Sequence, residues 1–271
     1  HIGDGEWERF ASMYETRVNF EGKIHLTKKK LLFLPETEKK LLIKRKERAQ
    51  PFTDKKILTS WNSLTGIALL MAGRYTENIH ATEKAEKLFE ALKKKHYSKQ
   101  KLIHSSLGEE KQTEEFLEDC ASFLLFTTYI YENTGKEKRL LEELYTKVKS
   151  FKKETWIESN NKDFREIPAQ SFDHPTPSST AVAEYALLRT EILLEKPYKE
   201  NNYKEALISD FYNIAAWTSQ GKMHIIHIEK TNWKDLPINC IQIQGKILQD
   251  CYEGKCMLFK NKDELIKSLG K

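Results

Sequence analysis

The sequence predicts a mainly α-helical protein, built as a partial α/α toroid of about three helical hairpins with a small C-terminal α/β appendage. Three observations predict this fold class. Apolar residues recur at helical spacing from residue 59 onward, the links between the helices are alternately short and long, and the last fifty residues change to strand-like patterns. We expect an N-terminal segment over residues 1–52, toroid hairpins over 53–221 and the α/β region over 222–271.

The N-terminal segment combines an apolar cluster, which includes Trp7 and Phe10, with a strand-like stretch at residues 23–33. One helix is expected at residues 36–48, where Lys and Glu alternate, and it should end before Pro51. Such an alternating run is typical of the solvated face of a helix.

Six helices are predicted after residue 59, each with an apolar stripe. They are expected at residues 60–74, 78–95, 114–132, 136–152, 178–194 and 203–218. The links within each pair are short, whereas those at about residues 96–113 and 153–177 are long, so the long links gather at one end of the bundle. That end is expected to carry the functional cleft, and three hairpins make half of a six-hairpin ring.

The C-terminal region is expected to hold short strands at residues 222–228 and 238–243 and a closing helix at 261–269. Cys251 and Cys256 are interpreted as strand-borne structural thiols, because a zinc pair would show tighter spacing and a second pair elsewhere. His224 and His227 are three apart on a strand, so they should point to opposite faces. We therefore expect no metal, and no other cofactor is indicated.

Composition excludes several classes of function. The chain of 271 residues contains 31% charged residues and carries a net charge of +5, a weak bias that does not indicate a nucleic-acid surface. No stretch reaches the roughly 20 apolar residues that a membrane span needs. Four cysteines predict a reducing, cytoplasmic compartment. The first residue is His1, which suggests a fragment or processed product.

The first polar segment at a helix start is PFTDKKILTSWNSL, residues 51–64. Its candidate ligand-binding residues are Asp54, Lys56, Trp61 and Asn62, because a carboxylate, an ammonium, an indole and an amide at one helix start suit a polar, ring-shaped ligand. The alternative is that Asp54 or Ser60 caps the helix and that Trp61 belongs to the core. For this segment alone, the alternative is favoured.

The second segment, EEFLEDCA, supplies Glu118 and Asp119 as candidate catalytic carboxyls. They lie about 100° apart around a helix, so one can face a lumen while the other does not. Acid–base work on a glycosidic bond needs two carboxyls about 5–9.5 Å apart, usually from different elements. The alternative, favoured for this segment alone, is that both carboxylates simply interact with the helix dipole.

The third segment, FDHPTPSSTAVAE, supplies Asp173, Thr176 and Ser178 as candidate ligand-binding residues. Free backbone N–H groups at this helix start would suit a hydroxylated or anionic ligand. Capping of the helix explains Ser178 equally well.

Together these segments resemble one family, the thioredoxin-domain-containing or spermatogenesis-associated proteins, in which a thioredoxin-like domain precedes an α/α toroid. DKKILTSWNSL resembles the family's Asp-Asp-Lys-x-Leu-x-x-Trp-Asn-Gly-Leu block, EEFLEDCASF its Phe-Leu-Glu-Asp-Tyr-Ala block and FDHPTPSSTAVAE its Asp-Gly-x-x-Pro-Ser-Gly-Asn-Ser block. The tail CYEGKCMLFKNKDELIKSL is similar to the family's closing segment. The resemblance runs from about Glu21 to the C-terminus, and the four segments have the family's order and approximate spacing.

The resemblance implies that a thioredoxin-like domain and half of the toroid lie upstream. It also implies a pocket similar to those of sugar 2-epimerases and six-hairpin glycosidases, formed by the nine candidates named above. Several positions depart from the family's blocks, which puts catalysis in question: Lys55, Ser63, Cys120, His174, Ser179, Thr180 and Ala181.

Three hypotheses follow. In the first, a carbohydrate-processing toroid binds a sugar-like ligand at the long-loop end, with Asp119 or Glu118 as acid–base groups and Trp61 as a stacking platform. In the second, a non-catalytic helical scaffold docks a partner, either a thioredoxin-like domain or the missing half-toroid. In the third, the protein is an accessory protein for redox reactions and uses Cys251 and Cys256.

Overall fold

The computed structural model describes residues 3–30, 33–161, 166–196, 211–212, 215, 223–229, 236–237 and 240–269, without the side chains of residues 19 and 20. The chain divides into two compact units, His1–Asp54 and Lys55–Lys271. The division falls close to the predicted end of the N-terminal segment, and the C-terminal α/β region belongs to the same unit as the helices. Among the described residues, no helix has both the length and the apolar character needed to cross a bilayer.

The first unit pairs two helices, α1 (Asp4–Met13) and α2 (Pro35–Lys46), through a small core of Phe10, Met13 and Leu34. Between the helices lie four very short strands, β1 (Tyr14–Glu15), β2 (Val18–Phe20), β3 (Lys23–Ile24) and β4 (Thr27–Lys28). The strand-like stretch predicted at residues 23–33 is thus limited to two short pieces, and α1 was not predicted.

Before its C-terminal region, the second unit has five helices that the structure describes in full: α3 (Thr59–Thr76), α4 (Ile79–His96), α5 (Leu117–Thr134), α6 (Lys138–Lys149) and α7 (Ser179–Leu193). They match the first five predicted after residue 59, and the mainly α prediction is confirmed. The sixth predicted helix, at residues 203–218, falls mostly outside the described residues; Phe211, Tyr212 and Ala215 are helical.

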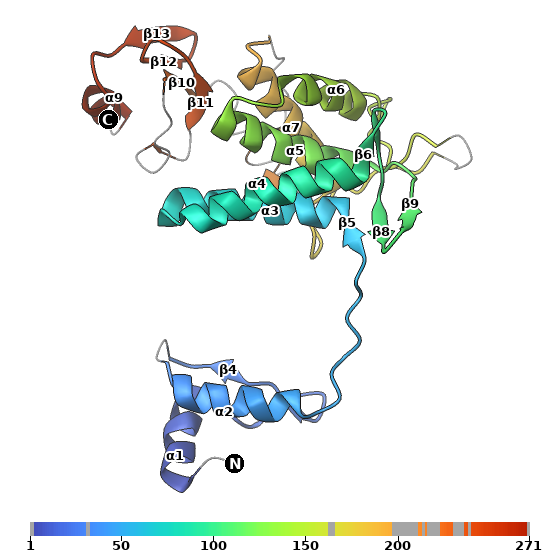
Figure 1. The fold of residues 1–271 in the computed structure, drawn as a ribbon, viewed down its shortest axis with the longest axis vertical. Helices are drawn as coiled ribbons and strands as arrows, with labels where there is room; N and C mark the ends of the chain where they lie inside the picture. Colours follow the sequence, from blue (N-terminus) through green and yellow to red (C-terminus); the bar gives the residue numbers. More distant parts are fainter. Residues whose placement is uncertain are drawn as a thin grey trace. The chain divides into compact units, whose positions relative to one another are not determined.

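Helix α5 is the centre of this array. It packs against α3 on one side and α7 on the other, and α6 covers it as well, while α4 packs on α3 (Figure 1). Its burial is almost continuous because neighbours surround it, and Leu117, Phe123 and Phe126 are among its fully buried side chains. A helix that is apolar on all sides is expected in such a position.

Helices α3 and α5 approach each other closely at one glycine. A Cβ built on Gly66 would lie 2.2 Å from Cζ of Phe126. Phe126 is fully buried and also meets Phe89 of α4 edge-to-face, with ring centroids 5.2 Å apart. The absence of a side chain at Gly66 therefore makes room for the ring that joins three helices.

Two helices begin at side-chain caps and one ends at a glycine, whereas α3 follows Leu58 with no side-chain cap, so the alternative that Asp54 or Ser60 caps it is wrong. Asn78 caps α4 by accepting a hydrogen bond from the N–H of Ala81 (3.3 Å), and Ser178 caps α7 by accepting one from Ala181 (3.1 Å). Gly135 ends α5 in the left-handed conformation, at φ 68°. The prediction that Ser178 is an N-cap is confirmed.

The long link between α4 and α5 folds into short hairpins. Its strands are β6 (Tyr97–Ser98), β7 (Lys101–Leu102), β8 (Ser105–Leu107) and β9 (Glu110–Gln112), and β8 also pairs with β5 (Ile57–Leu58), which precedes α3. Buried His96 holds this link: its Nδ1 lies 2.7 Å from Oγ1 of Thr59 and its Nε2 lies 2.9 Å from Oγ of Ser106. Thr59 also donates to the carbonyl of Ile103 (2.6 Å).

The C-terminal region is a four-stranded sheet with the order β11-β10-β12-β13. Its strands are β10 (His224–Ile228), β11 (Cys240–Gln244), β12 (Gln249–Tyr252) and β13 (Lys255–Leu258), and α9 (Lys262–Leu269) follows. One face packs on the helices through Ile225 and Ile241, and the other packs on α9, where Leu265 meets Ile226. The predicted strands and closing helix are present, but Cys251 and Cys256 form a disulfide, so the expectation of two structural thiols is wrong.

A buried ion pair connects the sheet to the helices. Arg189 of α7 donates to Glu132 of α5 (2.5 Å), and both side chains are almost wholly buried. The other carboxylate oxygen of Glu132 accepts the N–H of Gln242 in β11 (3.1 Å). One carboxylate thus joins two helices and a strand.

Candidate functional site

Four polar side chains gather where α3, α5 and α7 begin. They are His104, Glu118, Asp119 and Glu158, called here the acid–base cluster. His104 belongs to the link between α4 and α5, Glu118 and Asp119 lie in the first turn of α5, and Glu158 belongs to the link before α7. The cluster therefore draws on both long links and on the start of a central helix.

Asp119 is the buried centre of the cluster. One of its oxygens accepts the backbone N–H of Ser60 in α3 (3.0 Å), and the other lies 2.7 Å from Nδ1 of His104. The side chain of Asp119 is 1% exposed, and burial raises its pKa despite the hydrogen bonds from His104 and Ser60, which lower it. The hydrogen bond to Asp119 raises the pKa of His104, which favours an imidazolium against the carboxylate.

Glu118 is the accessible member of the cluster. Its carboxylate lies 3.7 Å from Nδ1 of His104, and its side chain is 40% exposed. Burial of the carboxyl raises its pKa to about 7, and repulsion from Asp119 and Glu158 adds to the shift. A carboxyl that titrates near neutral pH can both give and take a proton, which is what general acid–base catalysis requires.

Glu158 connects the cluster to α7. One of its oxygens accepts the N–H of Glu118 (3.4 Å) and the other accepts the hydroxyl of Ser179 (3.0 Å). Burial raises the pKa of Glu158 as well. Two carboxyl groups thus face one imidazole, and Glu158 adds a third carboxyl next to Glu118. This excess of negative charge favours shared protons or a bound cation.

The cluster also offers donors for a metal ion. One ligand atom each from His104, Glu118 and Asp119 lies within 4.8 Å of the others. Nδ1 of His104 already faces Asp119, so a cation there would have to replace that hydrogen bond. The imidazole–carboxylate pair is therefore the arrangement that the structure supports best.

The first polar segment, residues 51–64, contacts the acid–base cluster through its backbone rather than through the side chains predicted to bind a ligand. Asp54 and Lys56 are exposed and lie before β5, on either side of the boundary between the two units. Trp61 is 57% exposed, so the alternative that it belongs to the core is wrong. Asn62 donates to the carbonyl of Leu58 (2.8 Å). The described contact with the cluster is the N–H of Ser60 to Asp119.

The third polar segment mainly builds the start of α7. Asp173 accepts the N–H groups of Ser178 (2.8 Å) and Phe211 (3.0 Å), and Ser178 also donates to the carbonyl of Gln170 (3.1 Å). Thr176 is half-buried in the same turn. It is Ser179, which was not among the candidates, that reaches the cluster through Glu158.

Sequence reasoning missed His104 and Glu158, although a signal was present. Both lie in the two long links that were assigned to the functional end. A list of the titratable residues in those links would have included both. Their contacts with Glu118 and Asp119, however, depend on how the two links fold, which the sequence does not reveal.

A cavity of about 460 Å³ lies further along the same helices. Its lining includes Leu64 and Met71 of α3, Tyr129 of α5, and Tyr185 and Arg189 of α7. Leu64 follows Ser60 by four residues and Tyr129 follows Asp119 by ten, which at 1.5 Å per residue places the cavity about 6–15 Å along the helices from the cluster. Its volume and its aromatic walls are typical of a small-molecule site.

Comparison of the sequence with known protein families finds no match, and comparison with curated proteins finds none either.

The raised pKa of Glu118 predicts how stability depends on pH. Between about pH 4.5 and 7 the folded chain binds more protons at Glu118 than the unfolded chain, so its contribution to the free energy of unfolding falls as pH rises. Glu118→Gln does not titrate and should gain stability relative to the wild type at pH 8, by on the order of 1 kcal/mol after allowance for solvent screening. Thermal unfolding at pH 4.5 and pH 8 measures the difference.

The matched control is Glu110→Gln, on the exposed strand β9. It should show the same pH dependence as the wild type. If Glu118→Gln also follows the wild type at both pH values, the carboxyl is not held in the environment described here.

Proposed function

We propose that residues 55–271 form part of an α/α toroid that carries out acid–base chemistry on a sugar-like ligand. The proposal includes membership of the thioredoxin-domain-containing family that the sequence resembles. The observation that carries it is the buried His104–Asp119 pair, with Glu118 3.7 Å from the same ring nitrogen. This arrangement stands at the start of three helices, the end to which the long links lead.

Three groups of the cluster, Glu118, Asp119 and His104, have definite roles in this proposal. Glu118 transfers the proton, because it is accessible and its pKa is near 7. Asp119 orients His104 and favours its protonated form, so the imidazolium can polarise a carbonyl or hydroxyl oxygen of the ligand. Exposed Trp61, next to Ser60, offers a flat surface for a sugar ring.

The experiment is exchange of a carbon-bound hydrogen with solvent. The full chain is incubated in D₂O with a panel of neutral and amino hexoses, and deuterium at carbon 2 is followed by NMR; a parallel panel of 4-nitrophenyl glycosides tests hydrolysis. We expect activity on at least one panel and a loss of about 10²–10⁴-fold in Glu118→Gln.

Glu110→Gln should retain the wild-type rate, since β9 lies outside the cluster. Absence of exchange and hydrolysis above the uncatalysed rate would refute catalysis on these sugars. A rate that survives Glu118→Gln would remove Glu118 from the mechanism.

A second candidate function is supported by one face of α3. Trp61, Leu64, Ala68, Met71 and Tyr75 recur at a spacing of three or four residues, and Trp61 and Tyr75 are 57% and 47% exposed. A partly exposed apolar stripe suits the docking of a partner, as in the proposed scaffold for a thioredoxin-like domain or a further half-toroid. Light scattering tests it: concentration-dependent association that Trp61→Lys abolishes would support docking, and a monomer at all concentrations would favour the ligand site.

A further inference from the structure

The Cys251–Cys256 disulfide lies between the last two strands of the C-terminal sheet. The two residues face each other directly in the antiparallel pairing of β12 with β13, and their Cα atoms are 4.0 Å apart. Strand β13 is the edge of the sheet. Among the described strands, the disulfide therefore joins the edge strand β13 to its neighbour β12.

A tight turn creates this pairing. Glu253 and Gly254, the two residues between β12 and β13, have φ values of 49° and 74°. Positive φ at both central residues is typical of a two-residue hairpin, which sets Tyr252 opposite Lys255 and Cys251 opposite Cys256. The two sulfurs remain neighbours for as long as the hairpin is formed, whether or not they are bonded.

The disulfide is open to solvent on the β13 side. Cys256 is exposed and Cys251 is half-buried, and every residue of β13 is exposed. The two other cysteines of the chain, Cys120 and Cys240, are buried, and burial raises the pKa of both thiols. Thiolate chemistry depends on access and ionisation, so it should concentrate at Cys251 and Cys256.

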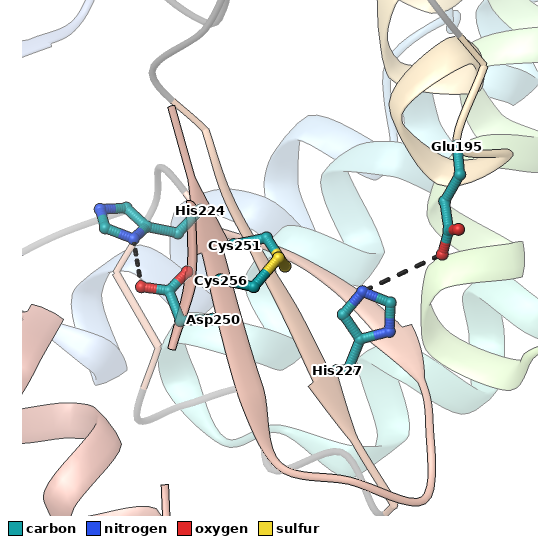
Figure 2. The surroundings of a disulfide bond; sticks show 6 residues. All are labelled: Glu195, His224, His227, Asp250, Cys251 and Cys256. Carbon is teal, nitrogen blue, oxygen red and sulfur yellow. Dashed lines mark hydrogen bonds and ion pairs between the residues drawn. A yellow bond between two sulfur atoms is a disulfide. The ribbon is translucent and has the colours of Figure 1, made fainter. Parts of the chain in front are cut away.

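Polar groups flank the disulfide (Figure 2). His224 pairs with Asp250 (2.8 Å) on one face of the sheet, and His227 on β10 lies 4.0 Å from Glu195. By strand alternation, His227 and Ile225 share a face, and Ile225 pairs with Cys251, so His227 is on the same face as the disulfide.

We propose that Cys251 and Cys256 form a reversible thiol–disulfide exchange site whose reaction partner is a dithiol. A thiolate of the dithiol attacks Sγ of Cys256, the accessible sulfur, and forms a mixed disulfide. The bond between the two cysteines breaks, and Cys251 leaves with the electron pair and takes up a proton.

The second thiol of the partner completes the exchange. It attacks the partner's other sulfur, the one bonded to Cys256 in the mixed disulfide, and Cys256 leaves as a thiolate and takes up a proton. Two electrons and two protons have then passed from the dithiol to the cysteine pair, and the dithiol has become a disulfide. In the reduced form, the antiparallel pairing with β12 still holds β13 at the sheet edge.

The test uses the full chain in its folded state. It is treated with dithiothreitol, alkylated with iodoacetamide and mapped by mass spectrometry, and a second sample is reoxidised with oxidised dithiothreitol. We expect alkylation at Cys251 and Cys256 and not at Cys120 or Cys240, and return of the disulfide on reoxidation. A pair that stays unreactive until the chain is denatured, or that does not reform, would overturn the proposal.

Single variants identify the attacked sulfur. In Cys251→Ser the thiol left in the pair is exposed Cys256, and in Cys256→Ser it is half-buried Cys251. With oxidised glutathione, Cys251→Ser should form the mixed disulfide several-fold faster. Equal rates, or a faster Cys256→Ser, would contradict the assignment of Cys256 as the reactive sulfur.

Discussion

Glu132→Gln should lower the free energy of unfolding by about 3–5 kcal/mol, because it removes one charge of a buried pair and leaves the guanidinium of Arg189 without compensation. Arg189 is 3% exposed and lies 4.0 Å from the ring centre of Tyr129, so it cannot turn to water without disturbing the packing of α5 and α7. Replacing the carboxylate of Glu132 by an amide also weakens the hydrogen bond that it accepts from the backbone N–H of Gln242 in β11. Chemical denaturation measures the loss.

Two further variants separate the buried charge from other effects. Glu132→Gln combined with Arg189→Met should recover much of the loss, since apolar replacement of a whole buried pair is often close to neutral. Glu90→Gln breaks the Lys93–Glu90 pair (3.0 Å), in which Glu90 is 62% exposed, and should cost less than about 1 kcal/mol. Equal effects of Glu90→Gln and Glu132→Gln would show that burial of the pair is not what stabilises it.

Phe126→Ala should also cost about 3–5 kcal/mol, because it empties a fully buried position between α3, α4 and α5. Gly66→Ala should cost about 1–3 kcal/mol, since the new Cβ would overlap the Phe126 ring. Denaturant unfolding of both variants and of the double variant gives the coupling between the two positions.

The two effects should not add. In the Phe126→Ala background the ring is gone, so Gly66→Ala should cost little or even stabilise α3, as Ala is the better helix former. Additive losses would mean that the close approach of Gly66 to Phe126 does not exist in solution.

Helix positions followed from the sequence because apolar periodicity is a local signal. Residues 60–74 and 78–95 were predicted to within two residues of α3 and α4, and the cap at Ser178 was named. Trp7, Phe10 and Met13 recur every three residues in α1, so that helix was also readable. Even the cysteine pairing had a local signal, a glycine two residues before Cys256 in a hairpin turn.

The residues of the candidate site could be predicted from the sequence only in part. Glu118 and Asp119 were chosen from a helix start, and the structure places both in the acid–base cluster. Their partners His104 and Glu158 come from links whose paths depend on tertiary contacts, and no local pattern fixes such contacts. Nor does the sequence distinguish whether Asp173 and Ser178 bind a ligand or form a turn. In the structure both form hydrogen bonds that build the start of α7.

The position of a single hydrogen follows from the contacts of His96. The hydroxyl of Thr59 has one proton, which it donates to Ile103, so it can only accept from Nδ1 of His96. Burial lowers the pKa of His96 to about 4 and keeps the ring neutral, so Nε2 carries a lone pair and receives the hydroxyl of Ser106. One imidazole tautomer thus fixes the direction of both hydrogen bonds by which His96 joins the start of α3 to the loop that presents His104.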